Sequence, residues 1–164
     1  MTLRILKKIG GTATLVDYSA EALRVARQNS LRYRLVDRIT FVQENVFNFI
    51  PRQGYDLVHS AGLIEHYPTR LNELLKKHIQ CANADGYVII MVPAPIWWYK
   101  LMRCFLENFH IWPKSFELPL DKYRLKSIAE ESGLKILKSL QSSGLARASA
   151  ILGVPSNMYR RSEL

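Results

Sequence analysis

Residues 12–29, TATLVDYSAEALRVARQN, are predicted to form a short strand that ends on an acid and passes directly into a helix. The run 13–16 is apolar apart from one threonine, which suits a strand buried on both faces of a parallel sheet. Ser19 is a good N-cap for a helix over about 20–29, because its hydroxyl can accept a backbone N–H that has no partner within the helix. Asp17 therefore lies at the carboxyl end of a strand, where open α/β sheets bind their ligands.

Two roles are open for Asp17 at this point. In nucleoside-binding folds an acid in this place accepts hydrogen bonds from ribose hydroxyls. The simpler role is structural, as a side chain that helps to cap the following helix. The stretch by itself favours neither role.

The composition is that of a globular protein with a basic surface. The chain has 164 residues, 48% of them hydrophobic, which is enough for one domain with a core. Its net charge is +9, but the cations are scattered, so a solvated basic surface is expected. No apolar run reaches the roughly 20 residues of a membrane span. Cys81 and Cys104 lack metal-site spacing and are expected to be free thiols in a reducing compartment, which favours a cytoplasmic location.

Strands and helices alternate along most of the chain, which predicts an α/β domain with a mainly parallel sheet. Further strands are expected at 39–43, 55–59, 87–92 and 135–140, and helices at 3–9, 71–82 and about 121–132. The apolar sides of the helices at 3–9 and 71–82 are expected to include Ile9 and Ala82. The tail has two interpretations, a helix through Leu152 or a last strand at about 150–154.

An aromatic segment at about 96–119 is longer than a plain loop between a strand and a helix, and it is predicted to be an insertion. It could line an apolar substrate pocket or rest on a lipid surface. The simpler alternative is a helical insertion that packs against the core.

Five segments of the chain together resemble the class I S-adenosylmethionine-dependent methyltransferases, in particular the small-molecule branch. The third of them follows the pattern D-L-V-x-S-x-x-L-x-E-H. The segments run in the family's order and at its spacing, from about Thr12 to Leu137: TLVDYSAEALRVARQN, RITFVQENVFNF, YDLVHSAGLIEHYP, ADGYVIIMVP and YRLKSIAEESGLKIL. The resemblance implies a Rossmann-like, doubly wound, three-layer α/β/α fold with a mostly parallel sheet.

The resemblance also implies a cofactor site for S-adenosylmethionine. Asp17 is similar to the acid that holds the ribose hydroxyls, and Tyr18 would flank the adenine ring. Asn45 stands where the family usually has an Asp that reads the adenine amino group, and Glu44 replaces a small residue. Val46 would offer its backbone N–H to the adenine edge.

Further site residues follow the strand predicted at 55–59. Ser60, Ala61 and Gly62 resemble the loop beneath the methionine part of the cofactor. Glu65 and His66 stand where several relatives place residues near the substrate or a metal ion, although a helix cap and a packing histidine would explain them equally simply. If the methyl acceptor is a hydroxyl, His66 is the best candidate base, because its unperturbed pKa lies near neutrality. His59 and His110 are weaker candidates.

One family feature is not found in this sequence. The family begins with a strand and a glycine-rich loop, D-x-G-x-G-x-G, whereas here Gly10-Gly11 falls at the end of the first predicted helix. We therefore expect that the first βα unit is missing. The missing strand would lie between the strands of Leu15 and Leu57, and its loss would expose two apolar edges. Those strands could close up, another chain could fill the gap, or the sequence could begin at an internal Met of a longer protein, which we favour over a degenerate remnant.

The expected function is methyl transfer from S-adenosylmethionine to a small molecule, with a hydrophobic or lipid-like acceptor as one option, by a single truncated domain spanning 1–164. The main alternative is a non-catalytic remnant of the fold that acts in binding or dimerisation. A nicotinamide-dependent oxidoreductase and a nucleic-acid-binding protein are less favoured. Expected partners are a small-molecule substrate, a second copy or partner chain that completes the sheet, and a peripheral membrane contact. Neither a specific nucleic acid nor a metal ion is expected.

Overall fold

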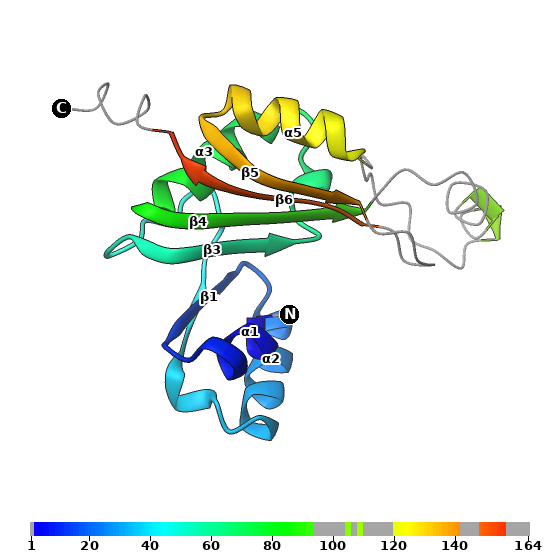
Figure 1. Cartoon of the computed structure of the whole chain (residues 1–164). Coiled ribbons are helices and arrows are strands. Elements are labelled where there is room, and N and C mark those ends of the chain that lie inside the picture. The colour runs from blue at the N-terminus through cyan, green and yellow to red at the C-terminus, as the bar shows by residue number, and fades with distance from the viewer. Residues whose placement is uncertain (1, 94–103, 106–107, 110–119, 142–147, 157–164) are drawn as a thin grey trace. The chain divides into compact units, whose positions relative to one another are not determined.

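The structure is a computed structural model that describes residues 2–93, 104–105, 108–109, 120–141 and 148–156. The chain divides into two compact units, Met1–Pro51 and Arg52–Leu164 (Figure 1), and each is described by itself. The aromatic insertion expected at about 96–119 lies almost wholly outside the described residues, as does His110. The single domain over 1–164 and the role of that insertion therefore stay predictions.

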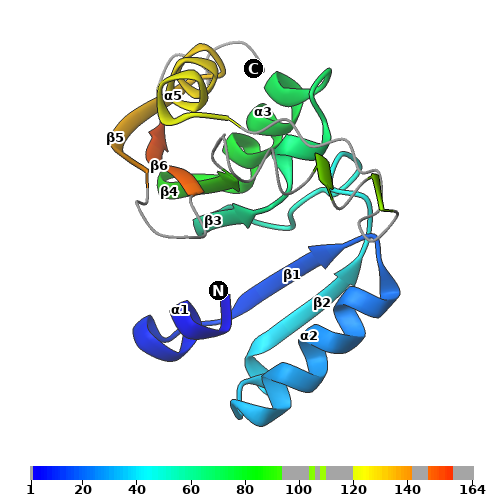
Figure 2. The same ribbon diagram turned by 90° about the vertical axis from the view of Figure 1, so that its right-hand side faces the viewer.

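The first unit is a two-stranded parallel sheet accompanied by two helices (Figure 2). The strands are in register from Ala13 opposite Ile39 to Asp17 opposite Gln43. A small core of Leu6, Leu35 and Ile39, with Ala13, Leu15 and Phe41 packed against it, joins the helices to the sheet. The elements are α1 (Thr2–Ile9), β1 (Ala13–Asp17), α2 (Ala20–Arg32), the 3-10 turn η1 (Val36–Arg38) and β2 (Ile39–Gln43).

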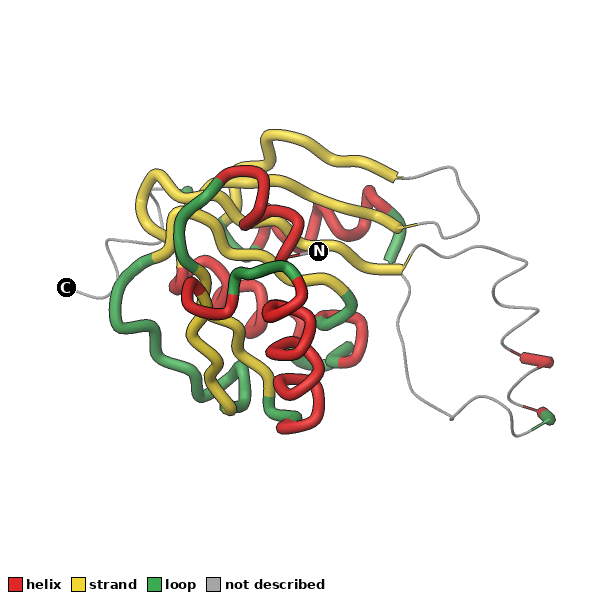
Figure 3. The backbone as a smooth tube through the Cα atoms, turned by 90° about the horizontal axis from the view of Figure 1, so that it is seen from below, coloured by secondary structure: helices red, strands yellow, loops and turns green. Residues whose placement is uncertain are grey.

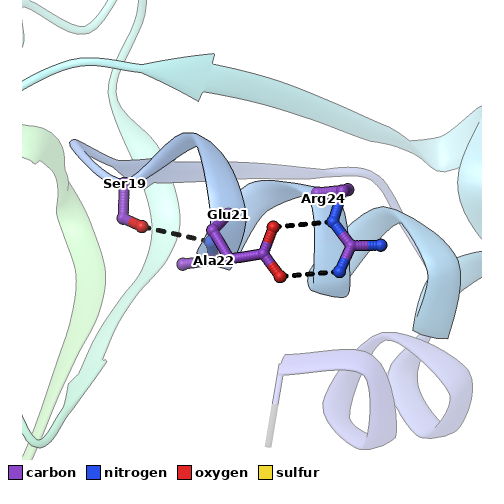
Figure 4. A network of polar contacts seen from close by, with 4 residues as sticks. All are labelled: Ser19, Glu21, Ala22 and Arg24. Atoms are coloured by element: carbon purple, nitrogen blue, oxygen red, sulfur yellow. Dashed lines mark hydrogen bonds and ion pairs between the residues drawn. The ribbon is translucent and has the colours of Figure 1, made fainter.

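Helix α2 begins where the sequence predicts. The Ser19 hydroxyl accepts the N–H of Ala22 at 3.2 Å, and Glu21 and Arg24 form a two-point ion pair one turn along (Figure 4). The helix ends at Arg32, three residues later than expected, and Arg34 then reverses the chain with φ of 55°. A non-glycine residue in this left-handed region is uncommon, since its Cβ crowds the following carbonyl.

The second unit is a four-stranded sheet in the order β3-β4-β6-β5 (Figure 1). Figure 3 shows the strands of the chain in yellow and the helices in red. β3 and β4 are parallel, and β6 lies antiparallel between β4 and β5, so β6 alone runs against the others. The tail therefore contains a strand, as one of the two interpretations predicted. The elements are β3 (Tyr55–Ala61), the 3-10 turn η2 (Ile64–His66), α3 (Leu71–Cys81), β4 (Ala82–Pro93), α5 (Lys122–Glu131), β5 (Leu134–Gln141) and β6 (Ala148–Pro155).

One face of this second sheet carries the main core of the unit. Val88, Ile90 and Val92 alternate along β4 and are at most 1% exposed. The helices α3 and α5 lie on the same side of the sheet (Figure 1), and they contribute fully buried leucines such as Leu74 and Leu125. Burial of this alternating apolar row fixes the register of β4, because a slip of one residue would turn the row to the other face.

Several sequence predictions need correction. Residues 13–17 of β1 are half-buried, not buried on both faces, because β1 has a strand on one side only among the described residues. Ile9 is 69% exposed, since α1 ends there and extends past its core contacts. Ala82 begins β4 and is not part of α3, and β4 is twelve residues long instead of six. β3 includes Ser60 and Ala61, which were expected to follow it.

Two sheet edges bear on the missing βα unit. Among the described strands, β1 pairs only with β2, and β3 pairs only with β4. The absence of a first βα unit stays a prediction. Among the described helices, none combines the length and the apolar character needed to cross a membrane.

Candidate functional site

The carboxyl ends of β1 and β2 bring the predicted adenosine-binding residues of the first unit together. The backbone N–H of Glu44 donates to the carbonyl oxygen of Asp17 at 3.1 Å, which extends the strand pairing by one bond. The side-chain amide of Gln43 reaches the carbonyl oxygen of Tyr18 at 3.4 Å. Sequence reasoning did not identify Gln43, and only the strand register, which sets it opposite Asp17, shows its place.

The two carboxylate oxygens of Asp17 have different surroundings. Its Oδ1 atom accepts the N–H of Ser19 at 2.8 Å, so the structural role is real. Among the described residues its second oxygen has no partner, which leaves an acceptor for a ligand. Tyr18 beside it is 72% exposed, so its ring is available to stack against a planar group. The two roles considered for Asp17 are therefore compatible, one for each carboxylate oxygen.

The turn after β2 is closed by its own side chains. The side-chain oxygen Oδ1 of Asn45 accepts the N–H of Phe47 at 3.0 Å, and the Glu44 carboxylate accepts the N–H of Asn45 at 2.8 Å. The amide nitrogen of Asn45 is thus the part of that side chain left free to meet a ligand. The backbone N–H of Val46 makes no hydrogen bond to any described residue. This edge offers one backbone donor and one side-chain donor next to the Asp17 acceptor.

The end of β3 in the second unit is shaped by a glycine. Gly62 has φ of +72°, a conformation that side chains rarely adopt, and its N–H donates to the Met91 carbonyl at 3.1 Å. The chain therefore turns sharply away from the sheet directly after Ala61. The hydroxyl of Ser60 is buried and has no hydrogen-bond partner among the described residues.

Glu65 and His66 lie in η2 and have opposite environments. Glu65 is 1% exposed, and one of its oxygens would lie 3.6 Å from a Cβ added at Gly62. His66 is exposed, so it is not a packing histidine. His59 is the packed one: its Nε2 atom is buried, and burial lowers the pKa of His59, which keeps the ring neutral.

His78 on α3 is a second buried histidine, outside the predicted site. Its Nδ1 atom lies 2.7 Å from the Leu74 carbonyl, and burial lowers the pKa of His78. Burial also raises the pKa of the Cys81 thiol, and both cysteines are free. Within the described part of the chain, no cluster of three or more His, Cys, Asp or Glu residues could hold a metal ion.

The predicted site residues thus form two groups. Asp17, Tyr18, Glu44, Asn45 and Val46 share one sheet edge of the first unit, and Ser60, Ala61, Gly62, Glu65 and His66 follow one strand of the second. A family model described as a methyltransferase domain matches residues 1–86, slightly more than half of the chain. The chain belongs to the methyltransferase domain family. The match contains all ten residues, and the family predicted from the sequence is confirmed.

The proteins to which the chain is similar include several methyltransferases. A bifunctional methyltransferase of Rickettsia prowazekii (strain Madrid E) is 31% identical over 75 residues, which is 45% of this chain and 14% of the relative. The chain therefore spans a small part of that relative's length.

Solved methyltransferase structures have the same fold. One is magnesium protoporphyrin IX methyltransferase from Synechocystis PCC 6803, crystallised with bound SAH. It superposes with a TM-score of 0.71 at 15% identity, and the match covers 93% of this chain and 68% of that protein's chain. Another is the N-methyltransferase NodS from Bradyrhizobium japonicum WM9, with a TM-score of 0.65 at 12% identity. That match covers 88% of this chain and 66% of the NodS chain. At such identities the likeness shows the fold alone, and the predicted class I methyltransferase fold is confirmed.

Proposed function

We propose that the chain contributes the adenosine site of an S-adenosylmethionine-dependent methyltransferase that acts on a small molecule. The observation that supports it best is the edge formed by β1 and β2. There the free oxygen of Asp17 and the free N–H of Val46 stand at adjacent strand ends, beside the exposed ring of Tyr18. These are an acceptor, a donor and a stacking surface, which is the set that an adenosine group requires.

The residues present fit the adenosine part of this cofactor with one departure. The second oxygen of Asp17 would accept a ribose hydroxyl, and Val46 would donate to the adenine ring. Asn45 differs, because its carbonyl oxygen already accepts the N–H of Phe47 and its amide nitrogen can only donate. It would therefore serve a ring nitrogen better than the adenine amino group.

The cofactor, when bound, supplies an activated methyl group on a sulfonium. The protein has to position the acceptor and exclude water, and it needs a base only when the acceptor loses a proton. The exposed His66 would take that proton from a hydroxyl, and Glu65 would stay buried behind Gly62. The substrate class, small and with a hydrophobic or lipid-like acceptor as one option, rests on the sequence resemblance.

Calorimetric titration of S-adenosylmethionine and of S-adenosylhomocysteine into the purified chain tests this function. Binding that is lost in Asp17→Ala and kept in Asp37→Ala would support the site. The control removes an exposed carboxylate from η1 of the same unit. A folded chain that binds neither compound would contradict the proposal for this chain.

The second candidate function is a non-catalytic binding or dimerisation module. The observation that favours it is the turn after β2, where Glu44 and Asn45 bond to their own backbone neighbours. Failure to bind the cofactor, together with a stable dimer in sedimentation, would support this candidate.

We propose in addition that a strand from a second copy or a partner chain completes the sheet. Support comes from β1 and β3, each of which has one pairing side without a partner among the described strands. Parallel strands usually have neighbours on both sides, and an open edge tends to recruit another chain. A mass measurement in solution above that of one chain would support this arrangement. A cytoplasmic location stays a prediction.

A further inference from the structure

The far end of the first unit, at the start of its strands, carries a surface of mixed character. Three large hydrophobic side chains are exposed there: Ile9 by 69%, Leu31 by 57% and Tyr33 by 44%. Four exposed cations accompany them, Lys7, Lys8, Arg32 and Arg34. We call these seven residues the basic-apolar corner.

Specific contacts hold the two helix ends of this corner together. The Lys7 ammonium lies 5.8 Å from the centre of the Tyr33 ring, which joins the last turn of α1 to the residue that caps α2. The guanidinium of Arg38 donates to the carbonyl oxygen of Gly11, which ties η1 to the end of α1. The buried Leu6, Leu35 and Ile39 lie beneath. The contact between Lys7 and Tyr33 therefore holds the ends of α1 and α2 close together beside packed residues.

The cations of the corner carry a positive charge that no described carboxylate pairs with. None of the four cations has an ion pair within the part of the chain that the structure describes. One carboxylate is near in sequence, the exposed Asp37 of η1. Cations at the ends of helices are partly explained by the helix dipole, which favours positive charge at a carboxyl terminus. That effect does not explain why Ile9 and Leu31 are exposed beside them.

We propose that the basic-apolar corner is a docking surface for a membrane that contains anionic lipid. Exposed aliphatic side chains gain free energy when they enter the boundary between headgroups and acyl chains, while lysine and arginine stay with the anionic headgroups. The phosphates of a nucleic acid would also attract the four cations. A nucleic acid offers no apolar layer for Ile9 and Leu31, because its backbone is charged and its bases bind by stacking and hydrogen bonds.

The position of the corner agrees with a docking role that is separate from the methyl-transfer site. The carboxyl ends of α1 and α2 precede the starts of β1 and β2 (Figure 2). Asp17, in contrast, is the last residue of β1, and Asn45 comes two residues after the end of the parallel strand β2. The two surfaces are separated by the length of β1, roughly 13 Å. A membrane on the corner would leave the carboxyl edge open to a ligand.

Co-sedimentation with vesicles tests the proposal. The probes are vesicles of phosphatidylcholine with and without phosphatidylserine. We expect binding to the mixed vesicles only. The pair Lys8→Gln and Arg32→Gln should weaken it about 25-fold, since each cation near such a surface contributes about fivefold. The matched pair Lys135→Gln and Lys138→Gln removes the same charge from β5 of the other unit and should change binding by less than about twofold.

A second pair of variants separates a membrane from a nucleic acid. Ile9→Ser with Leu31→Ser should weaken vesicle binding and leave the affinity for duplex DNA unchanged. Thermal unfolding confirms that each variant is folded, which is expected because the replaced side chains are largely exposed. Three results would overturn the proposal: no binding of the wild-type chain to mixed vesicles, equal losses for the two charge pairs, or an Ile9 and Leu31 pair that binds vesicles like wild type.

Discussion

Replacement of Asp17 by asparagine separates the two roles that the structure gives this side chain. Asparagine keeps a carbonyl oxygen that can accept the N–H of Ser19, now at 2.8 Å from Oδ1, so the turn before α2 should survive. The second oxygen becomes an amide nitrogen, which cannot accept a ribose hydroxyl. Loss of a hydrogen bond to a charged group costs about 1.5–3 kcal/mol, so the dissociation constant for S-adenosylmethionine should rise about 10- to 150-fold.

The assay pairs calorimetric titration with urea unfolding, because binding and folding must be measured on the same variants. Asp17→Asn should bind weakly and unfold like wild type. Asp17→Ala should bind weakly and also lose about 1 kcal/mol of unfolding free energy, because the Ser19 N–H loses its acceptor. Asp37→Asn is the control for a general effect of charge. The reasoning is refuted if Asp17→Asn binds the cofactor with wild-type affinity, or if it loses as much stability as Asp17→Ala.

Three further predictions concern stability. Arg34→Gly should raise the unfolding free energy by up to about 1 kcal/mol. The φ of 55° strains the arginine backbone, and relief of this strain should exceed the entropy that the more flexible glycine loses on folding. A lower urea midpoint for the variant would contradict this. Gly62→Ala should lower the unfolding free energy by about 1–2 kcal/mol, because its φ of +72° is unfavourable for alanine. Steric contact should add little, since the atom nearest to the new Cβ is 3.6 Å away. Gly62→Asn should recover part of the loss in the same urea assay, because asparagine adopts this conformation more readily. Burial lowers the pKa of His78 and of His59, so the unfolded chain binds more protons than the folded one. Stability should therefore fall as the pH drops below about 6.5, by up to about 1.4 kcal/mol per unit for the buried His78 and by less for the half-buried His59. The fall should be less steep in His78→Gln. A stability that does not change between about pH 7 and pH 5 would show that both rings stay neutral in the unfolded chain or are exposed in the folded one.

The local elements could be predicted from the sequence because their signals are local. The strand at 39–43 has the predicted bounds, and Ser19 caps α2 through the predicted hydroxyl. The end of α2 was missed because Arg34 takes the left-handed turn that glycine or asparagine usually marks. The length of β4 was missed because its first half contains Asp85 and Gly86, which are typical of turns, and because strand pairing depends on residues distant in the sequence.

The candidate site shows the same division between what local sequence determines and what strand pairing decides. The sequence alone determined the family and the residues at the strand ends, since the order and spacing of five segments carry that information along the chain. Only the tertiary structure decided how each group is used: one oxygen of Asp17 closes a turn while the other is open, and Asn45 turns its carbonyl oxygen to Phe47. It also decided that Glu65 is buried whereas His66 is exposed. The physical reason is that hydrogen-bond partners and burial depend on which atoms meet after the strands have paired, and neighbours in sequence do not report this.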